Sequence, residues 1–119
     1  MALDVNGVPT GGLTVDRLIS RGDTRTGVKE ITMTGTFYVQ PWRDPSHLFF
    51  DDNGSDRDIV LPQGEKGMAY FLMHVGDAQT LTVKNKAGTT LTKIDASNAT
   101  MTTGQFLTVF YTGTTWRVV

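Results

Sequence analysis

The stretch QFLTVFYTGTTWRVV (residues 105–119) decides the fold class of this chain. Residues 105–111 are rich in aromatic and β-branched side chains and are apolar on both faces of an extended chain. This pattern is typical of a strand that is buried on both sides. Residues 112–115 contain glycine and threonine, which suit a turn, and residues 116–119 make a last short strand. We therefore predict a β-hairpin at this end of the chain.

Short apolar runs separated by turn residues continue back to residue 28. Residues 31–40 alternate strictly, so they predict one strand with an apolar face and a threonine-rich face. Prolines end this strand and frame a loop. Residues 46–50 and 58–61 predict a second hairpin, joined by a turn rich in Asp, Asn and Gly.

Residues 68–75 form a further strand that is apolar on both faces. Residues 79–84 alternate again, and a turn then leads into an extended segment at residues 89–94. About eight short strands in roughly 90 residues favour an all-β fold, a small antiparallel β-sandwich or jelly-roll-like barrel. The two strands with two apolar faces leave one face to bury, and a sister subunit would cover it.

Residues 1–27 differ from this pattern and are predicted to be an extended N-terminal arm, with the β-sandwich domain at residues 28–119. The arm buries little by itself, and around residues 14–19 a helical turn and a short strand fit equally well. Its apolar side chains have no core of their own and are candidates for contact with a partner. They are Leu3, Val5, Leu13, Leu18 and Ile19.

Composition excludes several classes of function. The net charge of −1 gives no basic surface for nucleic acid or an anionic membrane, and no apolar run is long enough for a membrane helix. Cysteine is absent, which excludes disulfides and zinc–thiolate sites. The N-terminus has no secretory signal pattern, so we expect a protein made in a cytoplasm.

No residue pattern indicates catalysis or a cofactor. His47 and His74 stand alone, without the spacing of a metal site or a general base with a partner. The acidic run at residues 51–58 resembles a calcium loop in composition, but glycine falls at the wrong place and no glutamate closes the site. A turn explains the same residues better. We therefore predict no metal, no cofactor and no enzymatic activity.

Trp42 and Arg43 lie in the proline-bounded loop, close to Tyr38 at the end of the alternating strand. Trp and Arg are enriched at binding hot spots, which makes these three residues candidates for a surface contact. Equally, the Trp42 indole would cap the open end of a sandwich. Trp116, in the last strand, is predicted to belong to the core.

Four short motifs occupy the carboxy-terminal half. They are DIVLP (58–62), GMAYF (67–71), LTVKNKAGTT (81–90) and YTGTTWRVV (111–119). Together they resemble virion surface proteins of tailed bacteriophages, in which such motifs occur in capsid decoration proteins and in fibre domains alike. The chain has neither the repeats nor the extended stalk of a long fibre.

The resemblance implies a homotrimeric, all-β capsid decoration (cement) protein. Such a protein is structural, lies on the capsid surface of the virion after synthesis in the host bacterial cytoplasm, and binds the major capsid protein. An extended arm would bridge neighbouring capsid subunits. The alternative is a receptor- or glycan-binding domain of a phage tail fibre or baseplate, in which Trp42 and Tyr38 would stack on sugars. A polymer hydrolase would need two carboxylates across a cleft, which the turn-bound acidic residues do not suggest.

Overall fold

The computed structural model describes residues 2–5, 7–10, 27–76 and 79–119. In the arm, β1 (Ala2–Val5) and β2 (Gly7–Thr10) pair antiparallel in a two-stranded sheet of their own. Leu3 and Val5 lie on β1, whereas Leu13, Leu18 and Ile19 lie outside the described residues. The role of the arm therefore stays a prediction.

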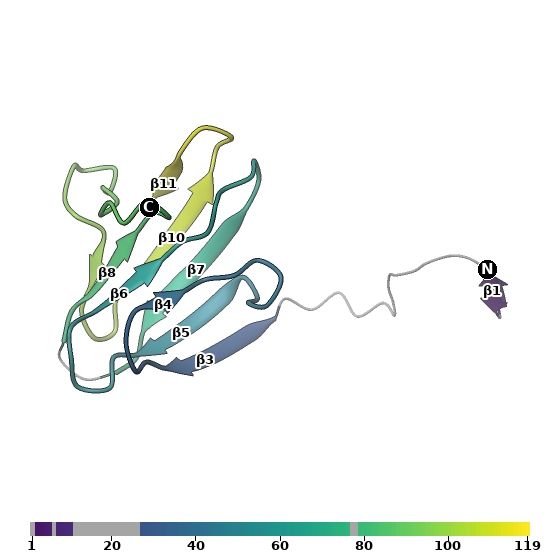
Figure 1. Cartoon of the computed structure of the whole chain (residues 1–119), viewed down its shortest axis with the longest axis horizontal. Helices are drawn as coiled ribbons and strands as arrows, with labels where there is room; N and C mark the ends of the chain where they lie inside the picture. The colour runs from purple at the N-terminus through teal and green to yellow at the C-terminus, as the bar shows by residue number, and fades with distance from the viewer. Residues whose placement is uncertain (1, 6, 11–26, 77–78) are drawn as a thin grey trace.

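The rest of the chain forms two β-sheets that pack face to face (Figure 1). The five-stranded sheet has the order β11 (Trp116–Val118), β10 (Phe106–Tyr111), β7 (Ala69–His74), β5 (His47–Asp51), β3 (Val28–Thr32). The four-stranded sheet has the order β4 (Phe37–Tyr38), β6 (Arg57–Val60), β8 (Leu81–Lys84), β9 (Thr100–Met101). The described residues contain no helix, so the predicted all-β sandwich is confirmed.

The pairing of the strands, however, is not the antiparallel one that we predicted. From β3 to β8 the chain crosses to the opposite sheet at every step, and β3, β5 and β7 pair parallel, as do β4, β6 and β8. These strands make three stacked turns of a flattened coil. Within the sandwich, antiparallel pairing joins β8 to β9, β7 to β10 and β10 to β11.

Two predicted elements are corrected by this crossing. The alternating run at 31–40 is not one strand, because it leaves the five-stranded sheet after β3 and enters the four-stranded sheet as β4. Met33 and Val39 are both buried, one on either side of the crossing. The predicted hairpin of 46–50 with 58–61 is also wrong, since β5 and β6 belong to different sheets and the mostly exposed turn between them connects one sheet to the other.

The two hairpins nearer the C-terminus have different outcomes. The turn at 85–88 is present, with the Asn85 amide bonded to the Thr89 carbonyl, but residues 89–94 form only isolated bridges rather than a strand. The hairpin at 105–119 is confirmed as β10 and β11. Trp116 is buried, as predicted for a core residue.

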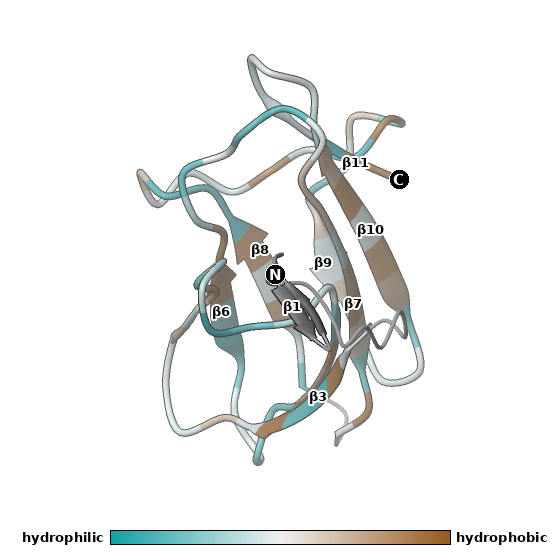
Figure 2. Ribbon diagram, turned by 90° about the vertical axis from the view of Figure 1, so that its right-hand side faces the viewer, coloured by the Kyte–Doolittle hydropathy of each residue, from teal (hydrophilic) through white to brown (hydrophobic). Residues whose placement is uncertain are grey.

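Both sheets turn an apolar face inward. The largest fully buried side chains come from both sheets and their connections, and include Phe50, Met33, Leu48, Ile59, Leu61, Leu72, Leu81 and Met101. Figure 2 shows β7 and β10 side by side in one layer, with hydrophobic colour along much of their length, and β6 and β8 in the other layer. β7 and β10 are therefore the strands whose second face is also apolar.

Candidate binding surfaces

The structure brings the three predicted contact residues together at one corner of the sandwich, after β4. Trp42 is 81% exposed and Tyr38 is 58% exposed. The Arg43 guanidinium lies 5.9 Å from the centre of the Trp42 ring and 5.1 Å from that of Phe37, distances at which a cation attracts an aromatic face. Its Nη2 also donates to the Tyr38 carbonyl at 2.7 Å. We call Tyr38, Trp42 and Arg43 the aromatic corner.

A buried carboxylate holds the corner in place. Asp44 accepts hydrogen bonds from the Arg43 Nε (3.0 Å) and Nη2 (2.9 Å), and from the Lys29 Nζ (2.8 Å). The Gln40 amide adds a fourth, at 2.8 Å. Burial alone would raise the pKa of Asp44, but these hydrogen bonds and the Arg43 charge lower it to about 2. The corner is thus built on a fixed anion, and the exposed Trp42 does not cap the core.

The outer side of the five-stranded sheet carries an apolar surface. Register places Phe106, Met73 and Phe49 in one row across β10, β7 and β5, and Phe71 and Val28 in the next row. Phe110 lies beyond them on β10. Phe106 is 65% exposed, and the Phe71 ring stacks on His47 at 4.5 Å between ring centres. These six apolar residues are the outer apolar face.

The outer side of the four-stranded sheet is different. Asp58, Thr82 and Thr100 lie side by side on it, and Lys84 forms an ion pair with Asp58 at 2.9 Å. Polar side chains of this kind favour contact with water. The two sides of the sandwich therefore differ in character, and the apolar one resembles an interface more than a solvent surface.

The two histidines do not form a catalytic arrangement. His47 stacks on Phe71, and His74 is fully buried with its Nε2 3.0 Å from the Asp52 Oδ2. In the acidic turn, Asp51 and Asp52 accept the backbone N–H groups of Asn53 and Gly54, as turn carboxylates do. Among the described residues, no three histidines or acidic residues gather where a metal ion would bind. No helix in the described part of the chain is long and apolar enough to span a membrane.

The comparison with protein families decides the origin of the chain. Residues 57–117, from β6 to β11, match the model of the phage depolymerase C-terminal beta sandwich domain. The chain belongs to this family. No curated protein and no solved structure matches it significantly.

Membership in the depolymerase C-terminal family identifies a bacteriophage protein associated with the virion or tail. It confirms the phage resemblance in that broader form, and nothing in the match is specific to capsid decoration. The matched region contains β7 and β10 of the outer apolar face, but the aromatic corner lies before it. The sequence predicted the residues of the aromatic corner but not Asp44, because in the sequence Asp44 has no feature that distinguishes it from other loop carboxylates.

Proposed function

We propose that this chain is a non-catalytic domain of a phage tail protein and that it binds glycans of the host surface through the aromatic corner. The observation that carries the proposal is the 81% exposure of Trp42 on a fixed support. An exposed indole costs free energy in water, since its apolar face has no partner. A ligand with an apolar face and a hydroxyl rim, such as a pyranose ring, would cover that face.

The support matters because binding pays for every side chain that becomes ordered. Here Arg43 is held by Asp44 and the Tyr38 carbonyl, and its guanidinium lies within reach of the Trp42 ring. The ring is therefore partly ordered before a ligand arrives. The Arg43 guanidinium also offers N–H donors to sugar hydroxyls or to an acidic sugar.

The test is a fluorescence titration of the full chain with oligosaccharides from the capsule of the host. Trp42→Ala should weaken binding about tenfold or more, while the fold persists, because exposed side chains contribute little to stability. Phe106→Ala is the matched control, since it also removes an exposed aromatic ring but lies on the outer apolar face. Unchanged binding by Trp42→Ala would refute the role of the corner.

We further propose that the outer apolar face joins copies of the chain, as a homotrimer. Charges at its two edges support contact between copies. Arg117 on β11 lies beside Phe110, and Glu30 on β3 lies beside Phe49 at the opposite edge of the sheet. Both side chains are exposed. A head-to-tail ring would place the Arg117 edge of one copy against the Glu30 edge of the next, which a closed cyclic assembly permits.

Capsid decoration remains the competing proposal for the same apolar face. The major capsid protein would then cover it, and the domain would stabilise the assembled shell by binding only that state. The family match favours a tail protein over this arrangement. Co-sedimentation with empty phage heads separates the two, because a tail domain should stay in the supernatant.

A further inference from the structure

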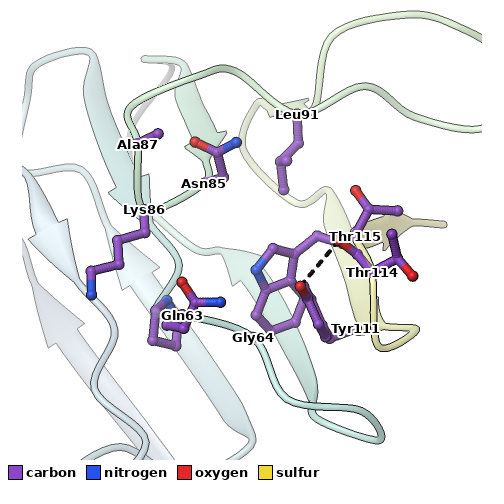
Figure 3. Close-up of a pocket in the computed structure, with 11 residues that line it drawn as sticks. Gln63, Gly64, Asn85, Lys86, Ala87, Leu91, Tyr111, Thr114 and Thr115 are labelled. Atoms are coloured by element: carbon purple, nitrogen blue, oxygen red, sulfur yellow. Dashed lines mark hydrogen bonds between the residues drawn. The ribbon is translucent and has the colours of Figure 1, made fainter.

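A hollow lies at one end of the sandwich, where three loops meet (Figure 3). The loops follow β6, follow β8 and join β10 to β11, so both sheets contribute to it. Its volume is about 200 Å³. Sites for drug-sized ligands measure about 300–1,000 Å³, so this one suits a single ring-sized unit.

An aromatic wall closes one side of the hollow. Tyr111 and Trp116 meet edge to face, with 5.2 Å between ring centres. The Tyr111 hydroxyl donates to the Thr114 carbonyl at 3.1 Å, which fixes the ring. Gly64 lies so close that a methyl group there would overlap the Tyr111 ring. The wall is therefore rigid, and its accessible part is the half-buried Tyr111 ring, with the buried Trp116 packed behind it.

Amides and hydroxyls provide the polar groups around this wall. Figure 3 shows Gln63 and Asn85 on one side of the hollow and Thr114 and Thr115 on the other. The Asn85 Oδ1 accepts the Thr89 amide at 2.9 Å, which fixes the side chain and leaves its NH₂ group as a donor. Gln63 is exposed.

The charge of the lining selects among ligands. Lys86 is the only charged residue among those that line the hollow, and Figure 3 shows its ammonium extending away from Tyr111. No carboxylate lines the hollow. Neutral donors and acceptors around an aromatic wall fit a neutral ring with several hydroxyl groups, because such a ring has an apolar face and a polar rim.

We infer that this hollow binds one neutral sugar unit of a glycan, with the Tyr111 ring, backed by Trp116, against its apolar face and the amides of Gln63 and Asn85 at its hydroxyl groups. The ligand class rests on the proposed function. The residues do not, since none of them belongs to the aromatic corner.

The two tryptophans make the test direct, because Trp116 lies at the hollow and Trp42 at the corner. Proton–nitrogen NMR of the full chain gives one indole signal for each, and loss of one signal in Trp42→Ala assigns both. The chain is titrated with the methyl glycosides of glucose, galactose and mannose, and with methyl glucuronide as the charged comparison. At least one neutral glycoside should shift the Trp116 signal in a saturable way, and methyl glucuronide should do so less.

Gln63→Ala should weaken that response at least fivefold, whereas Gln105→Ala, an exposed glutamine outside the lining of the hollow, should leave it unchanged. An unmoved Trp116 signal with every glycoside, or an equal affinity in Gln63→Ala, would overturn the inference. A shift of the Trp42 signal alone would refute sugar binding at the hollow and support binding at the aromatic corner. A shift of the Trp116 signal alone would support the hollow and refute the aromatic corner.

Discussion

Buried carboxyl groups stabilise this domain at two places, Asp44 and Asp52. Asp44 is the first of them, since its pKa of about 2 lies below the ordinary 3.8 of an aspartate. A carboxyl whose pKa falls on folding stabilises the protein above its unfolded pKa and loses that effect as the pH drops through its folded pKa. The contribution of Asp44 is thus complete above about pH 5 and is lost between about pH 4 and pH 2.

Asp44→Asn should lower the free energy of unfolding at pH 7 by about 2 kcal/mol, the equivalent of its pKa shift. The deficit should shrink as the pH falls towards 2, because the native carboxyl is then protonated as well. Urea unfolding at pH 7, 4 and 2 measures this. Asp56→Asn, in an exposed turn, is the control. An equal loss of unfolding free energy at pH 2 and pH 7 would contradict the lowered pKa of Asp44.

Asp52 and His74 form the second anchor, at the end of the sheet where β5 and β7 finish. Both side chains are 0% exposed, and the Asp52 Oδ2 also accepts the Gln79 amide. Asp52→Ala should cost about 3 kcal/mol, because breaking a buried pair leaves polar groups without partners. Urea unfolding at pH 7 checks it. The neighbouring Asp51→Ala removes a carboxylate from a more exposed place and should cost clearly less; equal costs would show that the pair is not an anchor.

Gly64 is the third sensitive position, for steric rather than electrostatic reasons. Gly64→Ala should cost about 1–3 kcal/mol, the usual penalty for forcing extra atoms into a packed site. Gly35→Ala is the matched control, because a methyl group at Gly35 would meet no atom within 4 Å. Thermal melts of both variants compare them. A Gly64→Ala protein as stable as Gly35→Ala would mean that Tyr111 is not held against the loop.

At the scale of strands, the sequence predicted local elements well and pairing poorly. The hairpin at 105–119 is local, and its turn residues mark it directly. The run at 31–40 kept its period of two while it crossed from one sheet to the other. Both sheets face the same core, so a single apolar alternation satisfies both and cannot reveal the crossing.

The candidate sites show the same division. Trp42 and Arg43 could be predicted as contact residues because of their residue types and their place in a proline-bounded loop. The contact between Lys29 and Asp44 could not, because these residues are 15 positions apart and meet only through the pairing of β3 with β5. The hollow of Gln63, Asn85 and Tyr111 was missed, because three separate loops build it. The outer apolar face was predicted, since two strands with apolar residues on both sides require one.

The proposed contact between copies depends on the charges at the two edges of the outer apolar face. Arg117→Glu should dissociate the proposed homotrimer by setting like charges against Glu30 of the next copy, and the double variant Arg117→Glu with Glu30→Arg should restore it. Light scattering after gel filtration measures the mass. A wild-type chain that runs as a monomer would refute self-association, and a double variant that stays dissociated would refute the head-to-tail contact.

At the scale of the whole molecule, the surfaces that carry the two proposals are separate. One side is apolar and suits contact with other subunits, while the aromatic corner and the hollow are exposed elsewhere on the domain. The proposed glycan binding and the proposed contact between copies can therefore be changed by separate substitutions.

The central claim, attachment to host glycans rather than to the capsid, is tested by sedimenting the labelled chain with two targets. One is the encapsulated host cell, with a capsule-free strain of the same host beside it, and the other is the empty phage head. We predict sedimentation with encapsulated cells, strongly reduced by Trp42→Ala and by loss of the capsule, and none with heads. Sedimentation with heads at full strength and with neither kind of cell would contradict the claim and establish a capsid protein instead.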